Sequence, residues 1–282
     1  MSGHSLSTIC VQGGWRPKNG DPRQLPIVQS TTFKYDSGEL MAKLFDLEAS
    51  GYFYSRLQNP TCDSVAAKIA ALEGGTAAML TSSGQAANFF AVFNIANAGD
   101  HVIALSTIYG GTYNLFANTY AEIGIETTFV DAHNPANIEA AIRPNTKAVY
   151  VESLGNPNSD VVDMEAIAEI AHKHGLPLIV DNTFATPFLF RPLEHGADVV
   201  VHSATKFIGG HGTVMGGVVV DGGKFDWAAS DKFPGLSKPN PSYHGVVFTE
   251  ACGNIAYIMK LRTTLMLSLI HISEPTRQAE IS

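Results

Sequence analysis

The chain has 282 residues, of which 45% are hydrophobic and 16% charged, a composition typical of a globular protein with a sizeable core. Its formal net charge of −8 argues against nucleic acid or an anionic membrane surface as the main partner. The cysteines, Cys10, Cys62 and Cys252, are too far apart for a CxxC pair and odd in number, so we expect a reducing cytoplasm. We also identify no signal peptide and no stretch apolar enough to span a membrane.

Residues 1–60 show no regular hydrophobic period. Glycine and proline recur through the first half of this segment, at Gly13, Gly14, Pro17, Gly20, Pro22 and Pro26. Both residue types interrupt regular secondary structure. We therefore predict an extended arm here rather than a packed domain.

From residue 61 onward, helical and strand patterns alternate. Thr61 is the expected cap of the first helix, over residues 61–73, which ends at Gly74. Further helices are predicted over residues 84–97, 113–122, 137–142 and 164–174, and strands over 77–80, 102–105, 125–130, 148–151, 178–180, 199–201 and 218–220. Apolar strands separated by helices of this length predict an α/β fold, with a mainly parallel sheet covered by helices.

The stretch over residues 199–212 joins a strand pattern to a reactive side chain. Three valines form a buried strand, and Lys206 follows within a few residues, before Gly209 and Gly210. Partial burial would lower the pKa of this lysine and favour Schiff-base formation with a carbonyl. The alternative is a solvated lysine in a glycine-rich loop.

Other polar and aromatic side chains also follow predicted strands. In an open α/β sheet, ligands bind beyond the carboxyl ends of the strands, so these residues are candidates for one crevice. They are Ser82, Ser83, Gly84 and Gln85 at a helix start, then Tyr109, Glu152, Asn156, Asp181, Ser203, Thr205 and Lys206. The set offers an anion site, an aromatic face, a carboxylate and an amine. Pyridoxal phosphate needs these four features for its phosphate, flat ring, ring nitrogen and aldehyde.

Several motifs in the chain resemble those of the pyridoxal-phosphate enzymes of cysteine and methionine metabolism. The resemblance covers roughly residues 5–260. It implies a fold of the aspartate-aminotransferase-like type (fold type I), of which this chain would hold the large domain. The motifs are Tyr54-Ser55-Arg56, Asn59-Pro60-Thr61, Ser82-Ser83-Gly84-Gln85-Ala86-Ala87, Tyr109-Gly110-Gly111-Thr112-Tyr113, Asp181-Asn182-Thr183-Phe184-Ala185-Thr186-Pro187 and Ser203-Ala204-Thr205-Lys206-Phe207-Ile208-Gly209-Gly210-His211-Gly212.

The resemblance assigns roles to individual residues. It implies that Lys206 forms the Schiff base with pyridoxal phosphate, that Asp181 pairs with the ring nitrogen, and that Tyr109 stacks on the ring. Asn156 would lie near the ring hydroxyl. The phosphate would be held by Ser83, Gly84, Gln85, Ser203 and Thr205, with Tyr54 and Arg56 reaching the site of a neighbouring subunit. No metal is expected, because His202 and His211 beside Lys206 lack the spacing of metal ligands.

Within the family, the chain is most similar to the O-acetylhomoserine sulfhydrylases. The implied reaction is γ-replacement, in which O-acetylhomoserine and sulfide give homocysteine and acetate, a step of methionine biosynthesis. The family's methionine γ-lyases typically carry cysteine at the position of Gly111, which argues against that lyase. A cystathionine γ-synthase or γ-lyase remains an alternative, as does a cofactor-binding fragment without catalysis. The resemblance also implies a homodimer, assembled further into a homotetramer.

The last part of the chain departs from the family pattern. The resemblance ends near Leu265, and the stretch Leu267–Arg277 looks like a translated sequencing-library adapter. The alternative is a divergent natural tail with no counterpart in the family. We therefore expect an arm over residues 1–60, a cofactor-binding large domain over 61–265, a non-native tail and no C-terminal small domain. A chain without that domain is expected to expose apolar surface and to turn over slowly.

Overall fold

The computed structural model describes residues 3–46, 48–131 and 133–265. Within these residues one seven-stranded sheet has the order β1-β7-β6-β5-β4-β2-β3. The strands are β1 (Ala77–Thr81), β2 (His101–Leu105), β3 (Glu126–Val130), β4 (Thr146–Glu152), β5 (Leu178–Asp181), β6 (Val199–His202) and β7 (Gly217–Asp221). Strands β2 to β6 pair in parallel, while β7 runs antiparallel to both β6 and β1. The predicted α/β fold with a mainly parallel sheet is confirmed.

The sheet is covered on both faces. Every residue of β2, β5, β6 and β7 is buried. Because successive residues of a strand point to opposite faces, continuous burial requires packing on each side. In the paired register Glu152 lies beside Asp181, and Asp181 beside Val201, so the carboxyl ends of β4, β5 and β6 meet at one edge.

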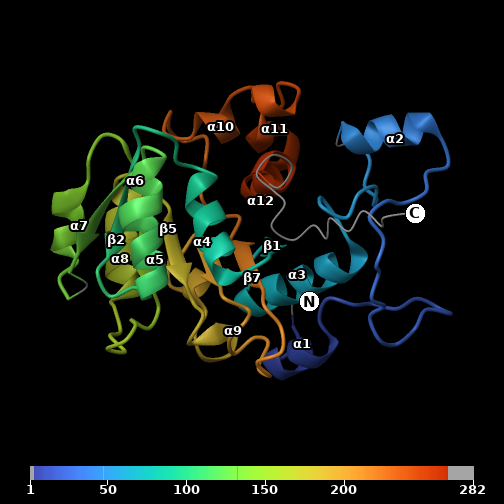
Figure 1. The fold of residues 1–282 in the computed structure, drawn as a ribbon, viewed down its shortest axis with the longest axis horizontal. Coiled ribbons are helices and arrows are strands. Elements are labelled where there is room, and N and C mark those ends of the chain that lie inside the picture. The colour runs from blue at the N-terminus through green and yellow to red at the C-terminus, as the bar shows by residue number, and fades with distance from the viewer. Residues whose placement is uncertain (1–2, 47, 132, 266–282) are drawn as a thin grey trace, which may run out of the picture.

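The helices over residues 60–173 follow the predicted order (Figure 1). They are α3 (Pro60–Glu73), α4 (Gly84–Phe93), α5 (Gly110–Asn114), α6 (Tyr120–Glu122), α7 (Ala136–Ala141) and α8 (Met164–Lys173). A π-helical turn, Leu115–Thr119, separates α5 from α6. One detail of the prediction is wrong: Asn59, not Thr61, caps α3, because its side chain accepts the N–H groups of Thr61 and Cys62.

The arm contains two short helices that we did not predict, α1 (Leu6–Gln12) and α2 (Gly38–Phe45). Helix α1 packs against α3, where Lys68 Nζ donates to the carbonyl of Cys10 at 3.2 Å. Helix α2 lies at the upper right of Figure 1, away from the sheet. The hydroxyl of Thr61 fixes the arm between them by donating to the carbonyl of Pro26 and accepting from Val28 N.

Short helical segments also follow β5 and β7, and these too were not predicted. After β5 come α9 (Thr186–Leu189) and a 3-10 turn (Pro192–Glu194). After β7, in orange to red at the top of Figure 1, come α10 (Pro234–Ser237), 3-10 turns (Pro241–Tyr243 and Gly253–Ile255), α11 (Phe248–Cys252), α12 (Ala256–Lys260) and a π-helical turn (Leu261–Leu265). Tyr257 of α12 is fully buried and donates to the carbonyl of Ala91 at 2.6 Å. Among the described residues, no helix is long and apolar enough to cross a membrane.

Candidate functional site

A cavity of about 250 Å³ lies at the carboxyl ends of β4, β5 and β6, beside the start of α4. It gathers all the predicted cofactor residues except Tyr54 and Arg56. The lining residues are Ser83, Gly84, Gln85, Asn88, Tyr109, Glu152, Leu154, Asn156, Asp181, Thr183, Phe184, Ser203, Thr205, Lys206 and Met215. The parallel strands explain the gathering, because their carboxyl ends share one edge of the sheet.

Asp181 is a buried carboxylate held by donors from its own strand end. Its Oδ1 accepts from the backbone N–H of Thr183 at 3.0 Å and from the Thr183 hydroxyl at 2.5 Å. Burial raises the pKa of Asp181, and the two Thr183 donors oppose that rise. A carboxylate fixed in this way can hold a positive charge on a ligand that enters the cavity.

The start of α4 forms the second wall. Ser83 caps the helix by accepting from Ala86 N at 3.1 Å, and the first N–H groups of a helix have no acceptor within it. The helix approaches the turn after β6 so closely that a Cβ at Gly84 would lie 2.5 Å from Ser203 Cβ. Glycine is therefore required at position 84. The first N–H groups of the helix and the helix dipole together make this wall suited to an anion.

Tyr109 supplies the aromatic face. Its backbone N–H donates to Glu152 Oε1 at 2.7 Å, and the residue remains 49% exposed. A Cβ at Gly111 would come within 2.5 Å of the Tyr109 ring, so the small residue leaves room for the ring in this position.

The turn after β6 carries Ser203, Thr205 and Lys206. It is held by Lys206 N donating to the carbonyl of Ser203, and by Thr205 N donating to the carbonyl of Gly216. Lys206 lines the cavity but is itself exposed. The expected partial burial of this lysine is therefore wrong for the single chain.

Sequence reasoning missed part of the cavity wall. Asn88, Leu154, Thr183, Phe184 and Met215 line it without having been predicted, and Glu152 was noted only for its place after a strand. Thr183 carried a usable signal, since a threonine two residues after an aspartate commonly donates back to it. Asn88 lies four residues after Gly84, on the same face of α4, which also could have placed it.

Tyr54 and Arg56 are not brought into the cavity that holds Lys206. They line a separate cavity of about 660 Å³, together with Met215, Gly216 and Arg262 among others. The guanidinium carbon of Arg56 lies 4.6 Å from the centre of the Tyr54 ring. The role expected of this pair in a neighbouring subunit stays a prediction.

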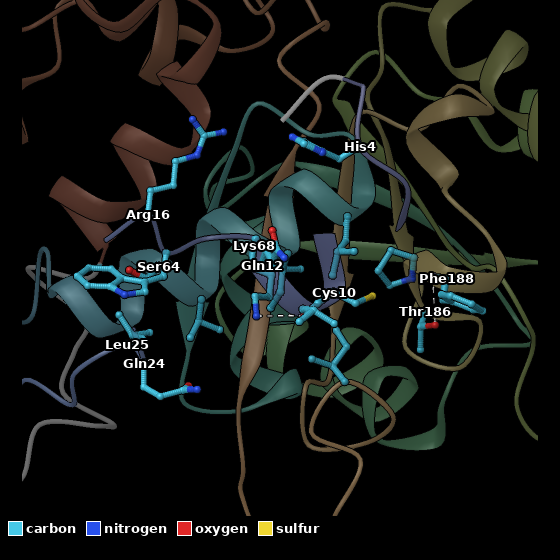
Figure 2. A pocket seen from close by; sticks show the side chains of 18 of the residues that line it. His4, Cys10, Gln12, Arg16, Gln24, Leu25, Ser64, Lys68, Thr186 and Phe188 are labelled. Atoms are coloured by element: carbon cyan, nitrogen blue, oxygen red, sulfur yellow. Dashed lines mark hydrogen bonds between the residues drawn. The ribbon is translucent and has the colours of Figure 1, made fainter. Parts of the chain in front are cut away.

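The most voluminous of these cavities, about 1170 Å³, contains none of the predicted site residues (Figure 2). It lies between α1, α3 and the segment around α9, with Arg16 and Lys68 on one side and Thr186 and Phe188 on the other. Among the described residues, its walls include the aromatic side chains of Trp15, Phe188 and Phe207 but no aspartate or glutamate to match Asp181. The cavity of about 250 Å³ that contains Lys206 is therefore the candidate active site.

The two histidines near Lys206 in the sequence, His202 and His211, are hydrogen-bonded to groups of the chain. His202 Nε2 lies 2.6 Å from Glu73 Oε1, and His211 Nδ1 lies 2.8 Å from the carbonyl oxygen of Gly209. In the part of the chain that the structure describes, no group of three or more His, Cys, Asp or Glu side chains could hold a metal ion.

Comparison with known proteins identifies the family. The family model described as "Cys/Met metabolism PLP-dependent enzyme" matches residues 7–251. The chain belongs to this family. The predicted resemblance is thereby confirmed.

Individual relatives agree with the family match. The chain is 53% identical over 261 residues to a homocysteine synthase of Schizosaccharomyces pombe, covering 92% of this chain and 61% of the relative. It is 45% identical over 267 residues to an O-acetyl-L-homoserine sulfhydrylase of Leptospira meyeri, covering 90% and 60%. The chain thus spans about three fifths of the length of these curated relatives.

A solved structure extends the agreement to the fold. The crystal structure of a putative O-acetylhomoserine (thiol)-lyase from Campylobacter jejuni superposes with a TM-score of 0.84 at 33% identity, covering 94% of this chain and 70% of that one. That protein contains a pyridoxyl-lysine phosphate group. The predicted large domain of fold type I is confirmed by this similarity.

The residues of the cavity fit pyridoxal phosphate, the cofactor of the family. Glycine at position 84 lets the start of α4 lie against Ser203, so the first N–H groups of the helix and the Ser203 side chain border the same cavity and suit a phosphate. Asp181, Tyr109 and Lys206 supply a carboxylate, an aromatic face and an amine around the same cavity. These groups suit the phosphate, the ring nitrogen, the flat ring and the aldehyde of the cofactor.

Proposed function

We propose that this chain is the cofactor-binding part of an O-acetylhomoserine sulfhydrylase, which converts O-acetylhomoserine and sulfide into homocysteine and acetate. The observation that carries the proposal is the meeting of Lys206, Asp181 and Tyr109 in one cavity at the start of α4. The names of the relatives support the choice of reaction within the family.

Each group of the chain has a distinct task in the proposed reaction. The N–H groups of Gly84 and Gln85 at the start of α4, with Ser203 and Thr205, would bind the phosphate of pyridoxal phosphate. Asp181 would keep a positive charge on the ring nitrogen, and Asn156 would contact the ring hydroxyl. When bound, the cofactor supplies an electron sink for negative charge at the α-carbon of an amino acid.

Lys206 is the residue placed to move protons. Its Nζ would take the proton from the α-carbon of the amino acid and return protons as the reaction proceeds. Over the whole reaction the Cγ–O bond of O-acetylhomoserine breaks, acetate leaves, and a C–S bond forms at the same carbon. The Tyr109 ring would stack on the flat ring of the cofactor and limit its movement, which favours a productive orientation of the bound amino acid.

The proposal is tested first on cofactor attachment. The purified chain should gain a visible absorbance band with pyridoxal phosphate, and borohydride reduction followed by peptide mapping should place the label on Lys206. Lys206→Ala should lose both the band and the label, whereas Lys224→Ala serves as a matched control. A label on another lysine contradicts the assignment.

The reaction is tested with a substrate panel on a longer version of the protein that carries a family C-terminal domain. Homocysteine formation from O-acetylhomoserine and sulfide is expected. Turnover with cysteine but not with sulfide would favour a cystathionine γ-synthase or γ-lyase. Cofactor absorbance without any turnover would favour a non-catalytic fragment.

We further propose that the protein works as a homodimer, assembled into a homotetramer, in the cytoplasm. The placement of Tyr54 and Arg56 outside the Lys206 cavity supports exchange of these residues between subunits. Exposed apolar residues also support a covering partner, among them Met215 (75%), which lines the Lys206 cavity, and Phe207 (61%), which follows Lys206 in the sequence.

A further inference from the structure

Glu152, the last residue of β4, is buried at the wall of the Lys206 cavity with one oxygen unsatisfied. Only 6% of the residue is exposed. Its Oε1 accepts the backbone N–H of Tyr109 at 2.7 Å, whereas its Oε2 is buried and has no hydrogen-bond partner among the described residues. An unsatisfied charged oxygen in such a place is costly, so its protonation state and intended partner require an explanation.

A second carboxyl group lies next to it. Glu152 and Asp181 are paired in register on adjacent parallel strands, so both side chains leave the sheet on the same face. Burial raises the pKa of both groups, and the charge of Asp181 adds to the effect on Glu152, whose pKa rises to about 8. Two neighbouring buried carboxyls cannot both ionise easily near neutral pH, so one of them keeps a proton.

The hydrogen bonds decide which of the two is neutral. Asp181 accepts from two donors of Thr183, and donors of this kind favour the ionised form. The charge of His202 also lowers the pKa of Asp181. Glu152 accepts from one donor only, the N–H of Tyr109. The proton therefore belongs on Glu152, and because Oε1 acts as an acceptor, it belongs on Oε2.

We propose that Glu152 is a neutral hydrogen-bond donor of the cavity wall, which holds Tyr109 through Oε1 and donates through Oε2 to an acceptor atom of the bound molecule. The inference rests on the proposed function in taking that molecule to be pyridoxal phosphate. Glu152 thus acts both on the ligand directly and, through the Tyr109 backbone, on the position of the aromatic face.

A neutral Glu152 also serves the carboxylate beside it. With Glu152 uncharged, Asp181 is the one negative carboxyl of the pair and can hold a positive ring nitrogen without competition. An ionised Glu152 would place a second negative charge at the wall of the same cavity. The assignment therefore separates the charged and the neutral carboxyl into different roles.

The protonation state can be measured on the chain without cofactor. The infrared spectrum of Glu152→Gln is subtracted from that of the wild type, both at pH 6.5. The difference should contain the band of one protonated carboxyl group, which the wild type has and Glu152→Gln lacks. The exposed Glu126→Gln is the matched control and should leave the band unchanged. Asp221→Asn must be recorded separately, because burial raises the pKa of Asp221 to about 7. A spectrum of Glu152→Gln identical to wild type, or loss of the band in Asp181→Asn instead, overturns the proposal.

The role toward the ligand is measured by titrating pyridoxal phosphate. Glu152→Gln keeps a neutral donor and an acceptor, so its dissociation constant should stay within about twofold of wild type. Glu152→Leu has the size but neither polar group, and should bind about tenfold more weakly, the effect of one lost hydrogen bond. Equal losses in both variants would mean that a negative charge is needed, which contradicts the proposal.

The two experiments separate this inference from the proposed function. If the wild-type chain fails to bind pyridoxal phosphate, the proposed function fails, while the infrared band still tests the proton on Glu152. If the Leu variant does not fold, as judged by urea unfolding, the comparison of Glu152→Gln with wild type still tests the assignment.

Discussion

Glu73 and His202 form a fully buried pair, with Glu73 Oε1 2.6 Å from His202 Nε2 and no accessible surface on either side chain. Glu73 is the last residue of α3, and His202 is the last residue of β6, directly before Ser203 of the candidate site. Asn182, which follows β5, donates to the same Glu73 oxygen at 3.0 Å. One carboxyl group thus joins a helix end to the ends of two site-bearing strands.

Removal of Glu73 should be strongly destabilising. Glu73→Ala leaves the His202 ring and the Asn182 amide buried without their common partner, and breaking a buried pair in this way typically costs about 3–5 kcal/mol. Urea unfolding of the chain with and without the substitution measures the loss of unfolding free energy. Glu39→Ala is the control, because the Glu39–Lys43 pair on α2 is exposed and should contribute less than about 0.5 kcal/mol. A Glu73→Ala variant as stable as this control would show that the buried pair contributes nothing.

The close approach of Gly84 to Ser203 predicts a selective effect on cofactor binding. In Gly84→Ala the new Cβ meets Ser203 Cβ at 2.5 Å and Ser203 Cα at 2.8 Å, so the turn that carries Lys206 must move away from α4. Affinity for pyridoxal phosphate should fall by at least about tenfold, since a displacement at a preorganised site removes contacts with the phosphate. Gly110→Ala is the matched control in the same region, because its Cβ meets nothing within 4 Å. Similar affinities for the two variants would contradict the role given to the α4–Ser203 contact.

The sheet and the main site residues could be predicted because their signals are local. Runs such as Val199-Val200-Val201 are β-branched and wholly apolar, as strands buried on both faces must be. Once those strands were placed, Asp181 and Lys206 followed from the rule that polar residues at carboxyl ends gather at one edge. The family motifs then supplied roles that spacing alone did not.

The parts that were missed depend on tertiary contacts. Helices α1, α2 and α9 to α12 have 4 to 8 residues, too short to be stable by propensity alone. They form where the surrounding chain holds them, as when the hydroxyl of Tyr243 donates to the carbonyl of Phe45 at the end of α2. The exposure of Lys206 was missed for a related reason. The burial of a side chain at a cavity depends on segments distant in sequence, and the residues that flank Lys206 do not specify them. The expected tail over residues 266–282 lies outside the described residues.

Asp221 should make the stability of the chain depend on pH. Burial raises its pKa from 3.8 to about 7, and the charge of Asp198 adds to the rise, whereas the Gly223 N–H, which donates to Oδ1, opposes it. The other oxygen, Oδ2, is buried without a hydrogen-bond partner among the described residues. The unfolded chain releases this proton at lower pH than the folded chain, so the contribution of Asp221 to stability falls between about pH 4 and pH 7 and is constant above. Asp221→Asn has no ionisable group at this position, so it does not undergo this decrease in unfolding free energy. Its stability relative to wild type should therefore increase by roughly 2–3 kcal/mol from pH 5 to pH 8.

Urea unfolding of wild type and Asp221→Asn at the two pH values measures that difference. The exposed Asp36→Asn is the control for the loss of one carboxyl group. A difference between wild type and Asp221→Asn that is the same at pH 5 and pH 8 would show that Asp221 is ionised in the folded chain throughout.

The proposed exchange of Arg56 between subunits predicts complementation between two defective chains. Arg56 and Lys206 line different cavities of one chain, so each complete site would take Lys206 from one subunit and Arg56 from its partner. Arg56→Ala and Lys206→Ala should each lack a complete site when expressed alone. In heterodimers of the two variants, one site has both native residues and the other has neither, so about half of the sites should bind pyridoxal phosphate tightly. The heterodimers are isolated by co-expression with two different affinity tags, and their cofactor content is compared with that of wild type.

Arg56→Lys tests the guanidinium itself, since an ammonium group cannot form the forked contact that arginine makes with a phosphate, and it should restore little binding. Heterodimers that bind no more cofactor than a mixture of the separate homodimers would place Arg56 outside the partner's site.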